Sequence, residues 1–204
     1  CSTEEGSSGS PIINLINNKV IGIHKESSNN YNLGLFLNYA IENFINHINN
    51  NINIIKDLNK RFNLNLEDND NLDKLELRFN KNEDIGKLDN MKIYNLKELN
   101  LNYSNISDIK VLERVAFENL KELNLSNNKI SDIKVLEKVK FENLKELDLS
   151  HNEISDIKIL EKIKFENLYK LYLSYNEILD IKVLEKVKFE NLKELDLSYN
   201  KISD

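Results

Sequence analysis

The chain has 204 residues, 40% of them hydrophobic and 30% charged, a balance that is ordinary for a folded protein of one or two domains. The formal net charge of −6 argues against a nucleic-acid backbone as the main partner. The sequence lacks an apolar run of the roughly 18 residues that a spanning helix needs, so we expect no membrane span, and the single cysteine, Cys1, excludes an internal disulfide.

The N-terminal part of the chain shows no internal repeat and is predicted to be β-structure. Two apolar runs, PIINLI at residues 11–16 and KVIGIH at residues 19–24, flank the dipeptide Asn17-Asn18, which is suited to a tight hairpin turn. A third apolar run, Leu33 to Leu37, follows a polar loop. We therefore expect a hairpin followed by one further strand.

The segment G-S-S-G-S-P at residues 6–11, with the VIGIH and NLGLFL runs, resembles the trypsin-like serine peptidases, especially their glutamate-cutting bacterial branch. The resemblance implies that residues 1–48 are the all-β C-terminal fragment of a chymotrypsin-like barrel, with Ser8 as the nucleophile. The backbone N–H groups of Gly6 and Ser8 would form the oxyanion hole, and Gly9 would allow the sharp turn that exposes the hydroxyl. The resemblance also implies a substrate-binding pocket lined by Thr3, His24 and Ser27.

A peptidase of this family carries its base histidine and orienting aspartate upstream of the nucleophile, and neither occurs among the seven residues before Ser8. The three histidines of the chain, His24, His47 and His151, all follow it. Because a serine without its base is a poor nucleophile, we expect the chain by itself to hydrolyse nothing. Since the chain opens with Cys1 rather than Met, we expect the catalytic His and Asp of an intact peptidase to lie upstream.

Other interpretations of this N-terminal segment stay open. The string GSSGS is also a common expression-tag scar, and the segment is alternatively an inactive remnant of a peptidase. His24, on an apolar strand, is equally well a core histidine, and His47, on the helix predicted next, is more simply a solvated residue.

An amphipathic helix, or a broken pair of helices, is predicted from Asn38 to about Phe62, where apolar residues recur at steps of three and four. The asparagine run at residues 49–51 is the candidate break. We expect residues 49–71 to be a helical linker in which Ile52–Leu66 caps the repeats that follow, because a stack of repeats exposes an apolar end unless another segment covers it. A partner-binding helix is the alternative.

From Leu72 to Asp204 the sequence repeats every 24 residues, and a period in the twenties is typical of a solenoid. Leucines open about six copies, the last cut in mid-coil, at Leu72, Leu96, Leu120, Leu144, Leu168 and Leu192. Each copy follows the pattern L-x-x-L-x-L-x-x-N-x-I, which resembles the leucine-rich repeat family. The resemblance implies an α/β fold: a right-handed solenoid with parallel strands on its concave side and short helices on its convex side.

The residues within one copy predict the same architecture. Leu123 and Leu125 alternate with polar residues, so a short strand buries one face. The asparagines that follow the strands are expected to stack as a ladder and bond to neighbouring backbone; the ladder comprises Asn80, Asn128, Asn152, Asn176 and Asn200, and Ser104 interrupts it. Ser131 and Asp132 look like helix N-caps. The inward-facing residues after them are Ile133, Leu136, Val139 and Phe141.

The resemblance implies that a protein partner binds the concave face. The candidate contact residues are the outward-facing strand positions and the position just after each strand: Asn100, Asn124, Asp148, Tyr172, Tyr175, Asp196 and Tyr199. The three tyrosines would form an aromatic patch, and tyrosine is favoured at interface hot spots. The alternative is that near-identical coils are recent duplications whose outer face is merely solvated.

Other kinds of site lack support in the sequence. No His/Cys cluster, Asp-rich loop or Gly-rich phosphate loop has the required spacing, so we expect neither a metal nor a cofactor. N-x-S sites at Asn102, Asn105 and Asn124 would place glycans on the strand face of a secreted eukaryotic protein, which favours an intracellular location.

Two function hypotheses follow. In the first, the intact protein is a serine endopeptidase that cuts a peptide substrate at Ser8, while its repeats recruit a protein substrate or a regulator. In the second, the chain is a non-catalytic leucine-rich-repeat scaffold that carries a relic peptidase segment.

Overall fold

The computed structural model describes residues 8–14, 19–25, 33–62, 72–79, 82–187 and 189–203. Side chains are described from residue 45 onward, apart from those of residues 82 and 83. The chain divides into two compact units: residues 1–57 with 65–70, and residues 58–64 with 71–204. Predicted features that lie outside the described residues include the Asn17-Asn18 turn, residues 63–66 of the predicted cap and the ladder position Asn80.

The first unit begins with a β-hairpin. Strand β1 (Ser8–Asn14) pairs antiparallel with β2 (Lys19–Lys25), so that Ser8 lies opposite Lys25 and Asn14 lies opposite Lys19. The hairpin predicted from the two apolar runs is therefore confirmed. Both strands contain β-branched residues, Ile12 and Ile13 in β1 and Val20, Ile21 and Ile23 in β2, which favour extended backbone.

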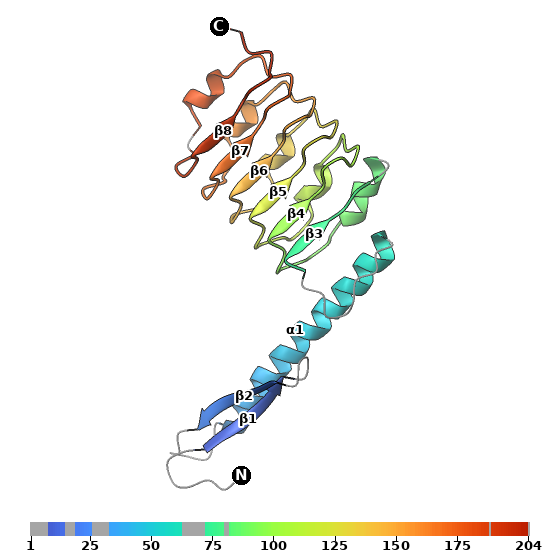
Figure 1. Cartoon of the computed structure of the whole chain (residues 1–204), viewed down its shortest axis with the longest axis vertical. Helices are drawn as coiled ribbons and strands as arrows, with labels where there is room; N and C mark the ends of the chain where they lie inside the picture. Colours follow the sequence, from blue (N-terminus) through green and yellow to red (C-terminus); the bar gives the residue numbers. More distant parts are fainter. Residues whose placement is uncertain are drawn as a thin grey trace. The chain divides into compact units, whose positions relative to one another are not determined.

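A single helix, α1 (Leu33–Phe62), follows the hairpin and runs 30 residues without a break (Figure 1). The prediction of a strand at Leu33–Leu37 is wrong, because these residues form the first turns of α1. A run of five apolar residues fits a strand or a buried helical turn equally well, and here it continues the helical spacing of the residues after it. The asparagines at residues 49–51 do not interrupt the helix, since asparagine is a mediocre helix former rather than a breaker like proline.

None of the described helices, α1 included, combines the length and the apolar character that crossing a bilayer requires.

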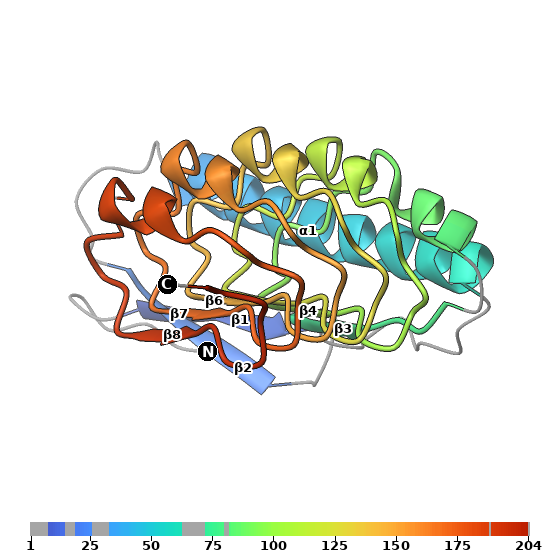
Figure 2. The same ribbon diagram turned by 90° about the horizontal axis from the view of Figure 1, so that it is seen from above.

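The second unit is a parallel sheet of six short strands, in which sequence order and spatial order are the same (Figure 1). The strands are β3 (Lys74–Glu76), β4 (Glu98–Asn100), β5 (Glu122–Asn124), β6 (Glu146–Asp148), β7 (Lys170–Tyr172) and β8 (Glu194–Asp196). Short 3-10 helices alternate with them: η1 (Asn82–Leu88), η2 (Lys110–Glu113), η3 (Lys134–Glu137), η4 (Lys158–Glu161) and η5 (Lys182–Glu185). Figure 2 shows the strands along one side of this unit and the helical turns along the other. The predicted solenoid of parallel strands and short helices is confirmed.

The strand register equals the sequence period. Leu75 pairs with Leu99, and Leu123 pairs with Leu147, each 24 residues along the chain. Residues that occupy the same place in successive copies therefore stack directly on one another. The inward-facing rows are buried as predicted, with Leu123, Leu147 and Leu171 each 1% exposed.

The asparagine ladder is also confirmed. Asn152 Nδ2 donates to the carbonyl oxygens of Leu125 in the preceding coil and Leu149 in its own coil, at 3.0 and 3.1 Å. Its Oδ1 accepts the Ile130 N–H at 2.9 Å. Equivalent bonds are made by Asn128, Asn176 and Asn200. Each asparagine thus satisfies backbone groups of two coils, as buried polar groups require.

The predicted caps are only partly present. Asp132 Oδ1 accepts the backbone N–H of Lys134, the first residue of η3, at 2.9 Å, and Asp108, Asp156 and Asp180 act likewise before the neighbouring helical turns. Ile133, rather than Ser131, occupies the N-cap position, and it makes no side-chain capping bond.

The two ends of the sheet differ in their cover. Arg61 Nη1, in the last turn of α1, donates to the carbonyl oxygens of Lys87 and Asp89 at 2.9 and 3.0 Å, and the ring of Phe62 stacks on that of Phe79 at 5.9 Å. At the other end, Leu195 of β8 is 38% exposed. Leu195 belongs to the same row as Leu147, and both are leucines. The greater exposure of Leu195 therefore arises from its lack of neighbours and not from its residue type.

Candidate partner-binding face

The outward-facing side of β3–β8, called the strand face below, consists of the first and third residue of each strand and the residues directly after it. Because side chains alternate along a strand and the strands are in register, the third residues form one row. This row contains Glu76, Asn100, Asn124, Asp148, Tyr172 and Asp196. The structure therefore brings together all the strand residues that were predicted to contact a partner.

Four residues of this row also shape the backbone. The side-chain Oδ1 atoms of Asn100, Asn124, Asp148 and Asp196 accept the backbone N–H two residues further on, at 3.0, 2.9, 2.9 and 2.9 Å. Such Asx turns end β4, β5, β6 and β8 and redirect the chain. The sequence signal for them is an Asn or Asp two residues before a Ser or Asn, and our sequence analysis missed it. Asp148 and Asp196 each have a second carboxylate oxygen outside the turn, whereas Asn100 and Asn124 have only the amide Nδ2 group outside it.

Asp196 and Tyr172 are among the groups of the strand face whose pKa values are shifted by their surroundings. The hydroxyl and backbone N–H of Ser198 both donate to the Asp196 carboxylate, which lowers the pKa of that group. Desolvation raises the pKa of the Tyr172 phenol, and a hydrogen bond to Glu194 adds to the shift. Asp196 therefore stays ionised and Tyr172 stays neutral over the physiological pH range.

Three rings stack at the edge where the strands end, and we call them the aromatic column: His151, Tyr175 and Tyr199. The ring centroids of His151 and Tyr175 lie 4.1 Å apart, and those of Tyr175 and Tyr199 lie 4.2 Å apart, with interplanar angles of 10° and 11°. Tyr172, which was predicted to join the two other tyrosines, lies in the strand row instead. Sequence analysis missed His151, although its 24-residue spacing from Tyr175 is the signal for the stack.

The backbone under the aromatic column is unusual for these residue types. The φ angles of His151, Tyr175 and Tyr199 are 52°, 53° and 54°, in the left-handed region that favours glycine and asparagine. Asn127, one coil before His151, has the same conformation with φ 55°. Aromatic residues thus occupy positions where an asparagine is less strained.

Charge on the strand face changes along the sheet. On the first two strands basic and acidic groups are paired, with Lys74 Nζ 2.6 Å from Glu98 and Arg78 Nη2 3.0 Å from Glu76. Further along, Lys170 pairs with Glu146 at 3.1 Å. Among the described carboxylates of the strand face, Glu122, Asp148, Glu194 and Asp196 are in no ion pair.

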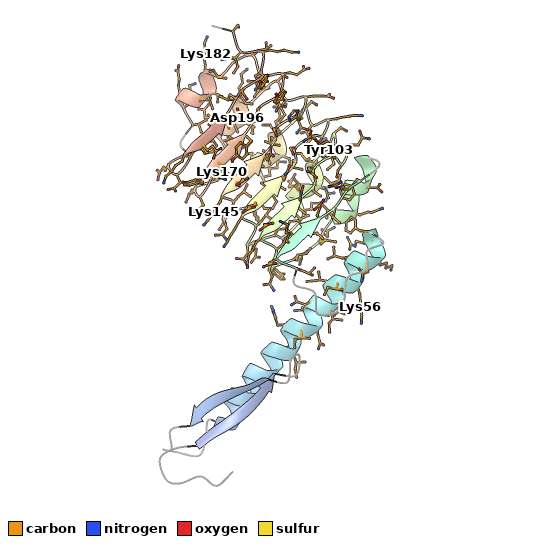
Figure 3. All side chains as sticks on the ribbon, in the orientation of Figure 1. Lys56, Tyr103, Lys145, Lys170, Lys182 and Asp196 are labelled. Atoms are coloured by element: carbon orange, nitrogen blue, oxygen red, sulfur yellow. The ribbon has the colours of Figure 1, made fainter. Side chains whose placement is uncertain are left out.

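The edge of the sheet where the strands begin is lined by lysines instead. Lys97 pairs with Asp73 at 3.2 Å, and Lys193 Nζ lies 5.0 Å from the ring centroid of Tyr169. Figure 3 shows Lys145 and Lys170 at this edge and Tyr103 at the opposite one. The strand face is therefore basic at one edge, acidic along its middle on the later strands, and aromatic at the other edge.

The predicted peptidase residues are only partly described. Ser8 and Gly9 lie in β1, opposite Lys25 and His24 of β2, within an extended strand rather than at the sharp turn implied for Gly9. Thr3, Gly6 and Ser27 lie outside the described residues. The roles given to these residues stay predictions. Among the described residues, no three His, Cys, Asp or Glu side chains gather as a metal site.

Comparison with known families finds matches in the repeated region. A family model described as "Leucine Rich repeats (2 copies)" matches residues 94–138 and 142–186, and one described as "Leucine Rich repeat" matches residues 190–204. No curated protein sequence matches the chain.

Several solved structures are similar to the chain. An internalin (inlF) of Listeria monocytogenes is 25% identical over 64% of this chain and 43% of its own, with a TM-score of 0.49. An internalin C2 of the same species is 30% identical over 64% of this chain and 53% of its own, with a TM-score of 0.49. The LRR ectodomain of the receptor kinase SOBIR1 from Arabidopsis thaliana is 16% identical over 98% of this chain and 84% of its own, with a TM-score of 0.39. The chain spans about half the length of the two internalins.

Proposed function

Because the repeats of this chain belong to the leucine-rich repeat family, we propose that it is a non-catalytic scaffold that binds a protein partner on its strand face. The aromatic column carries the proposal. Tyr175 and Tyr199 are 43% and 71% exposed, and both sit in left-handed backbone. Strained non-glycine residues persist where the surrounding structure holds them, and they concentrate at functional sites. Exposed tyrosines at such positions are better explained by contact with a partner than by folding.

The rigidity of the strand face supports the same function. Every strand is held to the next by in-register pairing, and the asparagine ladder ties the coils together just behind the aromatic column. A surface that is ordered before binding loses little conformational entropy when a partner arrives. Side chains on this face are therefore presented in fixed positions, as a recognition surface requires.

Site-directed photo-crosslinking in cells that express the intact protein tests the proposal. A photoreactive amino acid at Ser150, on the strand face, is expected to crosslink a defined protein. The same probe at Lys158, on η4, serves as the matched control and is expected not to crosslink that protein. The double substitution Tyr175→Asn and Tyr199→Asn should abolish the crosslink without unfolding the chain, because Asn127 already occupies the equivalent position. Equal crosslinking from both probe sites, or a crosslink that survives the double substitution, would contradict the proposal.

The serine endopeptidase predicted for the intact protein is a separate hypothesis. It rests on the segment at residues 6–11 and on the hairpin that follows it. The helical conformation of Leu33–Leu37 weakens it, because one of the expected barrel strands is missing. A fluorophosphonate probe on the intact protein tests it. Labelling that Ser8→Ala removes would support a peptidase, and absent labelling or labelling that survives the substitution would eliminate it.

A further inference from the structure

The aromatic column presents a stacked ring surface on the strand face. Stacking covers both faces of Tyr175, with His151 on one side and Tyr199 on the other. The second face of Tyr199 meets no other described ring, and this side chain is 71% exposed. A flat, fixed aromatic face of this kind accepts an aliphatic, aromatic or cationic group.

The carboxylates beside the aromatic column indicate that a cationic group is favoured over an aliphatic or aromatic one. In-register pairing places Glu122 next to Glu146 and places Tyr172 between Asp148 and Asp196. Like charges on adjacent strands repel each other. Lys170, the base in the strand rows of β5–β8, is already paired with Glu146. The surface formed by these acidic residues and the aromatic column, called the acid–aromatic surface below, consists of Glu122, Glu146, Asp148, Glu194, Asp196, His151, Tyr175 and Tyr199.

The bonds that these carboxylates make locally do not neutralise them. Asp148 Oδ1 accepts the Ser150 hydroxyl at 2.6 Å, and Asp196 accepts bonds from Ser198, which favours the charged form. Glu194 accepts a hydrogen bond from the Tyr172 phenol. Hydroxyl and amide donors hold the carboxylates in place and leave their negative charge on the surface, where a cation is the complementary partner.

Basic groups near the acid–aromatic surface restrict the position of a partner. The lysines at the edge where the strands begin include Lys121, Lys145 and Lys193. Beyond the aromatic column, Lys201 is paired with Glu177 at 3.3 Å, and Lys129 is exposed. The lysine edge repels a cationic segment, which leaves the middle of the sheet and the aromatic column as the surface complementary to one.

From this arrangement, and on the premise that the proposed function holds, we propose that the acid–aromatic surface on β5–β8 binds a cationic protein segment. Arginine or lysine side chains of the segment pair with Glu122, Asp148, Glu194 and Asp196, and one of them packs on the open face of Tyr199. The fold already contains a contact of this kind, since Lys193 Nζ lies 5.0 Å from the centroid of the Tyr169 ring. The strand face of β3 and β4 lacks this capacity because its charges are paired internally.

Fluorescence anisotropy with the purified chain tests the proposal. The probe is a fluorescein-labelled peptide of four Arg-Gly-Ser repeats, compared at physiological salt with the same peptide in which citrulline replaces arginine. The test variant is Asp148→Asn with Asp196→Asn, which keeps the Asx turns because Asn100 and Asn124 make them in neighbouring coils. The control variant is Glu137→Gln with Glu161→Gln, on η3 and η4, which changes net charge equally.

We expect the arginine peptide to bind wild type and control alike, and the test variant to bind about fivefold more weakly. Adding Tyr199→Asn to the test variant should weaken its binding of the arginine peptide further. Equal loss in the control and test variants would overturn the proposal, because it would show unspecific charge attraction. Tight binding of the citrulline peptide would also overturn it. If the partner crosslinked to the strand face binds through an acidic or neutral segment, this inference is contradicted and the proposed function stands. If neither a crosslink nor peptide binding is detected, the proposed function is contradicted as well.

Discussion

Leu147 and Asp148 are neighbours in β6, yet they belong to opposite sides of the sheet, which differ in burial and in how much the residue type varies from coil to coil. The inward row that contains Leu147 is leucine in every coil and is buried in every coil except the last. The outward row that contains Asp148 changes from coil to coil among Glu, Asn, Asp and Tyr. The inward side must fill the same space each time because identical coils stack on it. The outward side meets solvent or a partner, so its residues vary without loss of the fold.

The inward side should therefore dominate the free energy of unfolding. Leu147→Asn is expected to destabilise the protein by about 3–5 kcal/mol, because it removes buried apolar contacts and places an amide without partners in the core. Chemical denaturation measured by circular dichroism checks this value. A loss below about 1 kcal/mol would contradict the inward assignment of Leu147.

The same substitution in the last strand tests whether burial comes from stacking. Leu195 occupies the place of Leu147 in its coil but is 38% exposed, compared with 1% for Leu147. Leu195→Asn should cost less than half as much, since its amide reaches water. Equal losses at the two positions would show that the outermost coil is covered in solution.

The ladder, the polar part of the inward side, is expected to contribute less than the buried leucine Leu147. Asn152→Ala should cost about 2–3 kcal/mol, because carbonyl oxygens of two coils and the Ile130 N–H lose their partner within the core. The matched control is Asn143→Ala, whose exposed amide donates to Glu118 O at 2.8 Å. It should cost less than about 1 kcal/mol, since water replaces the amide. Thermal melts of both variants decide the order.

On the outward side, the lowered pKa of Asp196 predicts a small dependence of stability on pH. The folded state holds this carboxylate ionised through Ser198, so its contribution is present above the pKa of the unfolded chain. It disappears as the pH falls through the lower pKa of the folded state. The stability difference between wild type and Asp196→Asn should therefore shrink on acidification from pH 7 to about 3. A difference that stays constant over this range would show that the Ser198 contacts are absent in solution.

The smallest effect belongs to the exposed lysine edge. Lys145→Asn is expected to change the free energy of unfolding by no more than about 0.5 kcal/mol, because the side chain is exposed and no described residue pairs with it. Measured beside Leu147→Asn, two residues away, it gives the contrast between the two sides within one coil. Similar losses in the two variants would remove that contrast.

The period of the sequence was sufficient to predict the repeated unit, its register and its buried rows. Leu123 and Leu147 are 24 residues apart, and in a stack of identical coils that spacing has one geometric outcome. Asn152 was recognisable as a ladder residue for the same reason. Outside the repeat there is no period to fix the local structure. The five residues from Leu33 to Leu37 were therefore assigned to a strand, although they belong to a helix.

Contacts between outward side chains required the folded arrangement. The sequence places His151, Tyr175 and Tyr199 in equivalent positions, but their stacking at 4.1 and 4.2 Å depends on the spacing of neighbouring coils and on left-handed backbone that aromatic residues seldom adopt. Tyr172, grouped with these tyrosines by residue type, points elsewhere because it lies within the strand. Periodicity records which residues must be buried, since burial acts on every coil alike, whereas the partners of an exposed side chain are set by the packing of one coil on the next.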